Sequence, residues 1–173
     1  INLKFNFSRF FKATNVPIPS LTFFSSPFSN IDADDFEISL ELRNEAVEGI
    51  WTKDSENVEF LPIKVAEIFP NLLEYLAWYC SISKISKENF QWLSKLEEIN
   101  LCLNKIEEIE ENSFIDQTEL KELHLSSNKI KKLDENLFKN LFKNLRKLEL
   151  LDLSVNQLTS LPSNIFANLV ELK

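Results

Sequence analysis

The residue types of a hydrolase triad occur close together in the second half of this chain. The only histidine, His124, is followed by Ser126, and Asp152 comes later in the sequence. In such a triad the histidine takes a proton from the serine hydroxyl while the aspartate orients the imidazole ring. These residues can do that chemistry only if the fold brings them into contact and supplies backbone donors for an oxyanion.

Glutamates also recur in a way that raises the possibility of metal binding. Glu74, Glu98 and Glu122 follow one another at a constant interval, and carboxylate oxygens are the ligands that Ca²⁺ prefers. A site built from several histidines is excluded, because the chain has only one. Outward carboxylates at strand spacing are more often solvated than metal-bound, so we expect no metal and no cofactor.

Composition excludes several further classes of site. Gly49 is the only glycine, whereas phosphate-binding loops need several glycines. The formal net charge is −8, so nucleic acid is not an expected partner. The basic stretch 129–147 could form a basic patch, although a solvated face is the favoured interpretation. No segment approaches the ~20 apolar residues of a membrane span. The two cysteines, Cys80 and Cys102, are too few for a disulfide framework.

A repeated pattern dominates residues 72–172. Three stretches share the form L-x-x-[LI]-x-L-x-x-N-x-[LI]-x-x-[LI], and they are LEEINLCLNKIEEI, LKELHLSSNKIKKL and LELLDLSVNQLTSL, starting at Leu96, Leu120 and Leu148. A weaker copy, LLEYLAWYCSISKI, starts at Leu72. The position of the asparagine in the pattern is occupied in turn by Cys80, Asn104, Asn128 and Asn156. Internal repeats of this length are typical of solenoid architectures.

The last interval of the repeat is longer than the others. The interval from Cys80 to Asn104 equals that from Asn104 to Asn128, whereas the interval from Asn128 to Asn156 exceeds them. The surplus equals one copy of the unit FKNL, which occurs twice in succession as FKNLFKNL at residues 138–145. Because residues i and i+4 share a face of a helical turn, the extra unit lengthens one coil without changing the register of the next. Phenylalanines at matching positions are expected to form a buried spine: Phe90, Phe114, Phe138 or Phe142, and Phe166.

This pattern resembles the leucine-rich repeat family, in its 24-residue typical class L-x-x-L-x-L-x-x-N-x-L-x-x-L-x-x-x-x-F-x-x-L. The resemblance implies an α/β fold: a right-handed solenoid with a short-stranded parallel sheet on the concave face and irregular or short helical convex segments. Residues 72–173 would form the repeats, with coils starting near 72, 96, 120 and 148 and truncated at 172. Residues 36–71 would form an N-terminal cap and an irregular first coil, similar to those of secreted insect members. Residues 1–35 are an N-terminal extension for which the sequence defines no order.

A single coil of this length cannot bury its own apolar positions, so it must stack on its neighbours. The alternation of Leu123 and Leu125 with polar residues places these leucines inward on a short strand. We expect the asparagines to turn inward where each strand ends, because an amide can bond there to backbone groups that have left the ladder. Replacing Asn128 by alanine is therefore expected to cost about 1–3 kcal/mol.

The positions left facing outward form the candidate partner-binding face. Its N-terminal end is aromatic, with Trp51 a further candidate beside Trp78 and Tyr79, and exposed aromatic residues beside charges are typical of binding hot spots. Packing of Trp78 against Tyr79 or the N-terminal segment is the alternative. The acidic stripe would steer a protein with a basic surface. The candidate residues are Glu74, Leu76, Trp78, Glu98, Asn100, Cys102, Glu122, His124, Ser126, Leu150, Asp152 and Ser154.

The same alternation argues against catalysis by the triad residues. Ser126 lies two residues from His124 on a flat strand face, with no oxyanion turn or pocket. A pH-sensitive contact of His124 with Asp152, one coil away, is conceivable, but an ordinary exposed histidine is the favoured interpretation. Cys80 points inward and Cys102 outward, so no disulfide between them is expected.

The expected function is therefore that of a non-enzymatic protein-binding module. The typical class implies an extracellular or secreted location, as part of a recognition or receptor protein. One alternative is a structural or adhesive protein that self-associates through its uncapped C-terminal coil. The other is an intracellular scaffold whose thiols stay reduced. The sequon at Asn6 would carry a glycan only if the chain is secreted and that segment is exposed.

Overall fold

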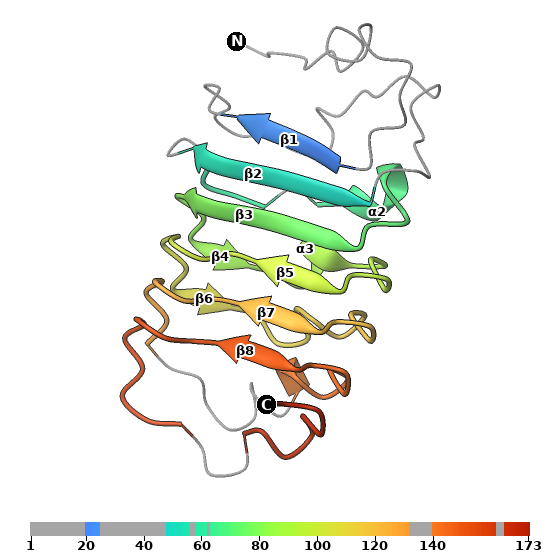
Figure 1. Cartoon of the computed structure of the whole chain (residues 1–173). Helices are drawn as coiled ribbons and strands as arrows, with labels where there is room; N and C mark the ends of the chain where they lie inside the picture. The colour runs from blue at the N-terminus through green and yellow to red at the C-terminus, as the bar shows by residue number, and fades with distance from the viewer. Residues whose placement is uncertain (1–19, 25–47, 56–57, 62, 132–139, 162–164) are drawn as a thin grey trace, which may run out of the picture.

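The chain folds into a stack of parallel strands joined by return segments behind them, as a computed structural model shows (Figure 1). The structure describes residues 20–24, 48–55, 58–61, 63–131, 140–161 and 165–173. Six strands form the main sheet in the order β1-β2-β3-β5-β7-β8. They are β1 Ser20–Phe24, β2 Gly49–Ser55, β3 Glu74–Cys80, β5 Glu98–Asn100, β7 Glu122–His124 and β8 Leu150–Asp152.

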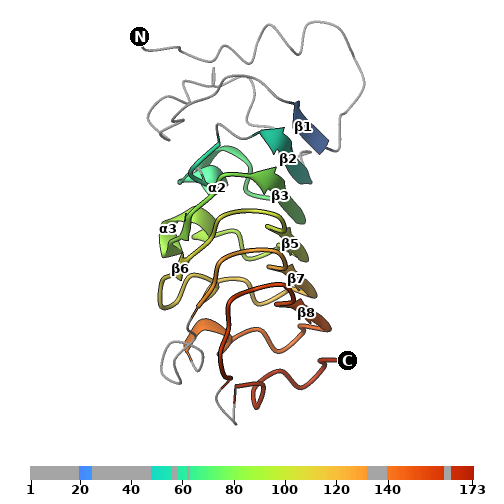
Figure 2. The ribbon, with the colours of Figure 1, turned by 90° about the vertical axis from the view of Figure 1, so that its left-hand side faces the viewer.

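The return segments carry the remaining described elements. A second, two-stranded parallel sheet lies behind the first and joins β4 (Lys84–Ile85) to β6 (Glu108–Ile109). Two helical turns, α2 (Val65–Ile68) and α3 (Lys87–Phe90), lie on the same side, opposite the main sheet (Figure 2). Within the described ranges, no helix has the length and apolar character needed to cross a membrane.

The register of the main sheet follows the sequence repeat. Glu74 pairs with Glu98 and Glu98 pairs with Glu122, so equivalent residues of successive coils lie side by side. β8 continues the series, because Glu122 pairs with Leu150 across the longer interval. The predicted fold class, a solenoid with a short-stranded parallel sheet, is thereby confirmed.

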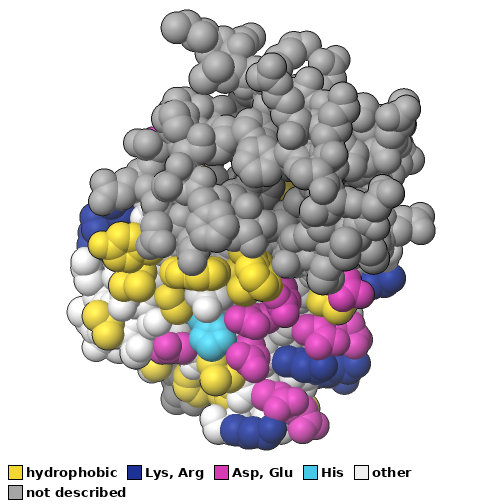
Figure 3. Space-filling model, turned by 45° about the horizontal axis from the view of Figure 1, so that its top comes forward, with side chains coloured by type: hydrophobic (Ala, Val, Ile, Leu, Met, Phe, Trp, Pro, Cys, Tyr) yellow, Lys and Arg dark blue, Asp and Glu magenta, His cyan; other side chains and the backbone are white. Residues whose placement is uncertain are grey.

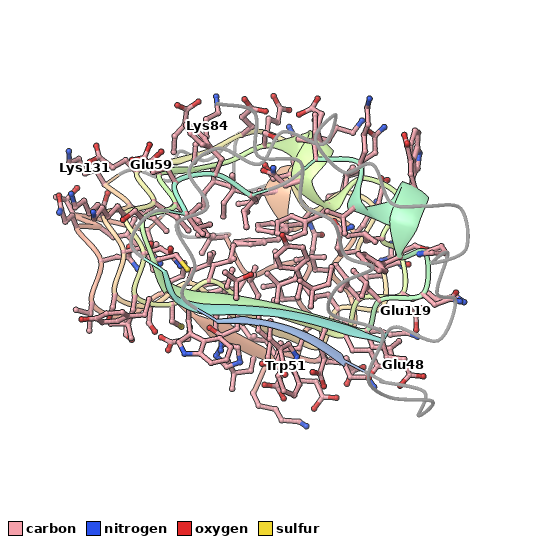
Figure 4. All side chains as sticks on the ribbon, turned by 90° about the horizontal axis from the view of Figure 1, so that it is seen from above. Glu48, Trp51, Glu59, Lys84, Glu119 and Lys131 are labelled. Atoms are coloured by element: carbon pink, nitrogen blue, oxygen red, sulfur yellow. The ribbon has the colours of Figure 1, made fainter. Side chains whose placement is uncertain are left out.

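One continuous core fills the space between the sheet and the return segments (Figure 4). The inward residue of each strand, such as Ile99 or Leu123, is fully buried, and so are the leucines two residues further on, Leu101 and Leu125. Each coil gains its buried surface mainly from its neighbours, since a single coil has no interior of its own.

The phenylalanine spine is confirmed for three of its positions. Phe90 and Phe114 are completely buried and stack with ring centroids 5.6 Å apart. Phe142 is buried at the next position, so it takes the spine site that the sequence assigned to either Phe138 or Phe142; Phe138 lies outside the described residues. The prediction was wrong for Phe166, which is 41% exposed. Phe166 lies in the last coil, where no further described coil packs over it.

The asparagine row also turns inward, as predicted. Asn128 accepts a hydrogen bond from the backbone N–H of Ile106 at 3.0 Å and donates to the carbonyls of Leu101 and Leu125 at 2.9 and 3.1 Å. Asn104 and Asn156 make the equivalent bonds in their own coils. Each of these amides therefore joins its own coil to the preceding one, through backbone groups that no longer pair in the sheet.

A row of left-handed residues precedes the asparagine row. Tyr79, Leu103, Ser127 and Val155 have φ between 51° and 56°. Non-glycine residues in this region are uncommon and carry a conformational cost. The side-chain hydrogen bonds of the residue that follows fix the conformation of the turn and offset that cost. The turn also directs the side chains outward, so Tyr79 is 50% and Val155 75% exposed.

The N-terminal part of the sheet contains two strands outside the regular repeat. β2 lies within residues 36–71, where an irregular first coil of the solenoid was expected, and β1 pairs with it from residues 1–35, for which the sequence defined no order. The interval from Gly49 to its partner Glu74 is slightly longer than the regular repeat, and the interval from Ser20 to its partner Gly49 is longer still. A search for a constant period cannot find such partners. Much of the predicted N-terminal cap, residues 36–47, lies outside the described residues.

Candidate functional site

The outward side chains of the main sheet form three rows across the coils. We call this surface the concave face, because the strands lie on the inner side of the gentle curve of the stack (Figure 2). The first row is Glu74, Glu98, Glu122 and Leu150, and the second is Trp51, Leu76, Asn100, His124 and Asp152. Backbone bonds beyond the strand ends align the third row: Trp78, Cys102, Ser126 and Ser154. The structure thus brings all twelve predicted residues to one face.

Trp51 extends the apolar end of this face. It lies beside Leu76 in the sheet register, and its indole Nε1 donates a hydrogen bond to Oε2 of Glu74 at 3.0 Å. The side chain points away from the interior (Figure 4). From the sequence alone Trp51 is only a further candidate, because the irregular offset of β2 conceals its row. The bond holds the Glu74 carboxylate at the apolar end of the face.

His124, the cyan side chain in Figure 3, lies next to acidic side chains on the concave face. Its Nε2 is 3.0 Å from Oε2 of Glu122, two residues earlier on the same strand. The imidazole thus contacts Glu122, whereas the influence of His124 on Asp152, the less favoured alternative from the sequence, is a minor electrostatic one. Asp152 instead binds Ser154: its Oδ1 accepts the backbone N–H of that residue at 2.9 Å. Hydrogen bonds from Ser154, chiefly from its side chain, lower the pKa of Asp152.

Glu98 carries negative charge in this cluster without a cationic lysine beside it. Partial burial, and then the neighbouring carboxylate of Glu122, raise the pKa of Glu98 above its ordinary value. A carboxyl group with a raised pKa in the folded state ionises less readily there than in the unfolded chain. Ionised Glu98 consequently lowers stability, and this penalty grows as the pH rises through the pKa of the group. Binding of a cationic ligand to the ionised Glu98 carboxylate would offset this penalty.

Neighbouring acids are neutralised, unlike those of the concave face. Lys121 pairs with Glu97 at 2.7 Å and Lys147 with Glu119 at 2.5 Å, each across one coil. In the last coil Lys173 pairs with Glu149 in the same way. No lysine or arginine whose side chain the structure describes pairs with Glu98 or Glu122. The negative potential is therefore concentrated on the face rather than on its border.

The three triad residues do not make the contacts of a triad. His124 contacts Glu122, and the Oγ of Ser126 lies 3.1 Å from the Sγ of Cys102. Ser126 also hydrogen-bonds to Asp152, which helps to lower the pKa of that carboxyl. The serine is thus held by groups other than the imidazole that would have to deprotonate it.

Cys80 and Cys102 form no disulfide with each other. Cys80 is buried at the position of an asparagine, and its Sγ lies 3.6 Å from the carbonyl of Trp78. Cys102 is half-buried on the concave face. The alternation along successive strands therefore separates the two thiols onto opposite sides of the sheet.

Comparison with known proteins assigns the chain to a family. The profile described as "Leucine rich repeat" matches residues 78–130 and 118–173. The chain belongs to the leucine-rich repeat family. Domains of this family generally bind proteins, and the resemblance inferred from the asparagine and leucine spacing is confirmed.

The solved structures include a similar but much longer chain. The crystal structure of a TLR13–ssRNA13 complex matches with 25% identity and a TM-score of 0.61. The match covers 75% of this chain and 22% of that one, so this leucine-rich repeat segment corresponds to about a fifth of the TLR13 chain. Among curated proteins, no sequence matches this chain.

Proposed function

We propose that this leucine-rich repeat domain is a non-enzymatic protein-binding module whose concave face recognises a partner with a basic surface. The observation that carries the proposal is the acidic centre, Glu98 and Glu122, which has no described lysine or arginine partner and lies next to an aromatic and apolar end. We further propose that the module belongs to an extracellular recognition or receptor protein. The similarity to the TLR13 chain supports this role.

The apolar end of the face provides the residue types that dominate binding energy. Trp51, Leu76 and Trp78 lie on neighbouring positions of β2 and β3, and Tyr79 is half exposed beside them. Hydrophobic side chains border the acidic centre in the space-filling view (Figure 3). Tryptophan and tyrosine at the centre of an interface are typical hot spots, because they bury a large area with little loss of conformational freedom.

The acidic centre supports a basic protein partner through long-range attraction. Carboxylates of one sign gathered on a surface raise the association rate of an oppositely charged protein, and salt weakens this effect. The rigid sheet adds to the affinity, since its backbone does not need to be ordered on binding.

RNA is not the ligand that we propose, although the TLR13 structure contains a single-stranded RNA. Binding of a nucleic acid needs lysine or arginine side chains against the phosphates. The outward rows of β3, β5, β7 and β8 instead carry four acidic residues: Glu74, Glu98, Glu122 and Asp152. Their only basic side chain is the imidazole of His124. Such a surface repels a phosphate backbone.

Capture of partners from an extract of the source organism tests this function. We expect the double variant Trp78→Ala/Glu98→Lys to lose more than nine-tenths of the partner that the wild-type chain retains. The matched control is Trp92→Ala/Glu88→Lys, because Trp92 is 62% exposed and Glu88 lies on α3, away from the concave face. The control should retain the partner fully, and retention should decrease with added salt.

Equal retention by both double variants would contradict a concave binding site. Sedimentation of the isolated chain distinguishes the adhesive alternative, which is favoured if association increases with concentration and is lost when a capping coil is appended. The intracellular alternative is equally compatible with the lack of a disulfide between Cys80 and Cys102. A signal peptide upstream in the full transcript would remove that alternative.

A further inference from the structure

We infer that Glu98, Glu122 and His124 form a binding site for a divalent transition-metal ion, for which Zn²⁺ is the natural probe. The three residues come from two neighbouring coils, and their ligand atoms all lie within 4.8 Å of one another. They are the only such group of three or more histidine, cysteine, aspartate or glutamate residues within the described ranges. The inference does not depend on the identity of a protein partner.

The sheet register places the two carboxylates and the imidazole on one face. Glu98 pairs directly with Glu122 across β5 and β7, and His124 follows Glu122 by two residues, so all three side chains project outward. The ring nitrogen Nε2 of His124 is already 3.0 Å from Oε2 of Glu122. A tetrahedral Zn²⁺ with bonds of about 2.0–2.2 Å holds its ligand atoms about 3.4 Å apart. Small rotations of two long glutamate side chains bring the set to that spacing.

The charge of the site also needs a counter-ion. Lysines pair with the acids bordering the face, such as Glu97 and Glu149, but none whose side chain is described pairs with Glu98 or Glu122. Glu98 and Glu122 are direct register partners on β5 and β7, so their carboxyl groups lie side by side. A divalent cation between these oxygens would replace their mutual repulsion with attraction.

The histidine selects the class of metal. Imidazole nitrogen with two carboxylates suits Zn²⁺ and related transition metals, whereas Ca²⁺ and Mg²⁺ prefer sites made only of oxygen ligands. Three protein ligands also leave one coordination position open, to water or to a group of a partner. A bound cation would reduce the negative charge with which the concave face attracts a basic protein, so occupancy of the site would regulate that face.

Calorimetric titration of the purified chain with Zn²⁺ tests the site. We expect one ion per chain, binding at least tenfold weaker in His124→Gln and in Glu122→Gln, and no comparable binding of Ca²⁺. The matched control Glu88→Gln removes one exposed carboxylate from α3 and should bind Zn²⁺ as the wild type does. Cys102→Ser controls for the half-buried thiol on the same face and should also leave the affinity unchanged.

Two results would overturn the inference. One is a His124→Gln variant that binds Zn²⁺ as tightly as the wild type, since His124 is the only histidine of the chain. The other is an equal loss of affinity in Glu88→Gln, which would indicate general attraction to an acidic surface. All three ligands lie on the surface of the sheet, so the variants should keep the circular dichroism spectrum and melting temperature of the wild type. A variant that has lost its fold is replaced by His124→Asn or Glu122→Ala in the same titration.

Discussion

Phe114→Ala is expected to reduce the free energy of unfolding by about 3–5 kcal/mol, the range for truncation of a fully buried phenylalanine. Phe114 has no exposed surface, and it stacks on Phe90 of the preceding coil at 5.6 Å. Removing the ring leaves a cavity between two stacked coils, because the side chains of neither coil can move to fill the space. Urea unfolding followed by circular dichroism measures the change in midpoint.

The matched control for this substitution is Phe166→Ala. Phe166 occupies the equivalent place in the last coil but is 41% exposed, so its truncation should cost about 1 kcal/mol or less. Equal losses for the two substitutions would show that burial between coils does not determine stability. An unchanged midpoint for Phe114→Ala would contradict the stacked core itself.

Asn128→Ala should reduce stability by about 3 kcal/mol, at the upper end of the range expected from the sequence. The substitution leaves the buried backbone N–H of Ile106 and the carbonyls of Leu101 and Leu125 without the partner that they have now. A buried polar group that loses its partner costs about 1–3 kcal/mol. The same unfolding experiment measures the effect.

Asn100→Ala provides the control, because it removes the same side chain from the opposite side of the sheet. The Asn100 side chain accepts the backbone N–H of Cys102 at 3.2 Å and also hydrogen-bonds to the carboxyl of Glu98, both on the half-exposed concave face. Its loss should change stability by about 0.5 kcal/mol or less. A midpoint for Asn128→Ala no lower than that of Asn100→Ala would contradict the role of the asparagine row.

The sequence predicted the repeats well because their register depends on residue type at fixed spacing. Leucines at inward positions and asparagines at the strand ends are required by packing and by unsatisfied backbone groups, and both requirements recur in every coil. The outward rows then follow from alternation along a strand. The doubled FKNL unit was also interpreted correctly as an insertion, since Phe142 is buried at the spine position and the pairing of Glu122 with Leu150 survives it.

The remaining features depend on interactions that spacing does not encode. The residues of β1 and β2 are separated from their pairing partners by intervals that differ from the regular repeat, so a periodic pattern does not predict these strands. His124 has a carboxylate within reach on its own strand and another on the next coil, and only its side-chain rotamer decides between Glu122 and Asp152. The grouping of the ligand atoms of Glu98, Glu122 and His124 within 4.8 Å of one another depends on side-chain rotamers in the same way. The exposure of Phe166 depends on what packs over the last coil, which its position in the repeat cannot specify.

Hydroxyl-radical footprinting of the chain, free and in complex with a captured partner, tests the binding role of the concave face most directly. The reactive side chains Trp78, Tyr79 and His124 lie on or beside that face, and the exposed Trp92 lies on a return segment. We predict that the complex protects Trp78, Tyr79 and His124 from oxidation while Trp92 reacts as in the free chain. Protection of Trp92 with unchanged oxidation of Trp78 and His124 would contradict the account.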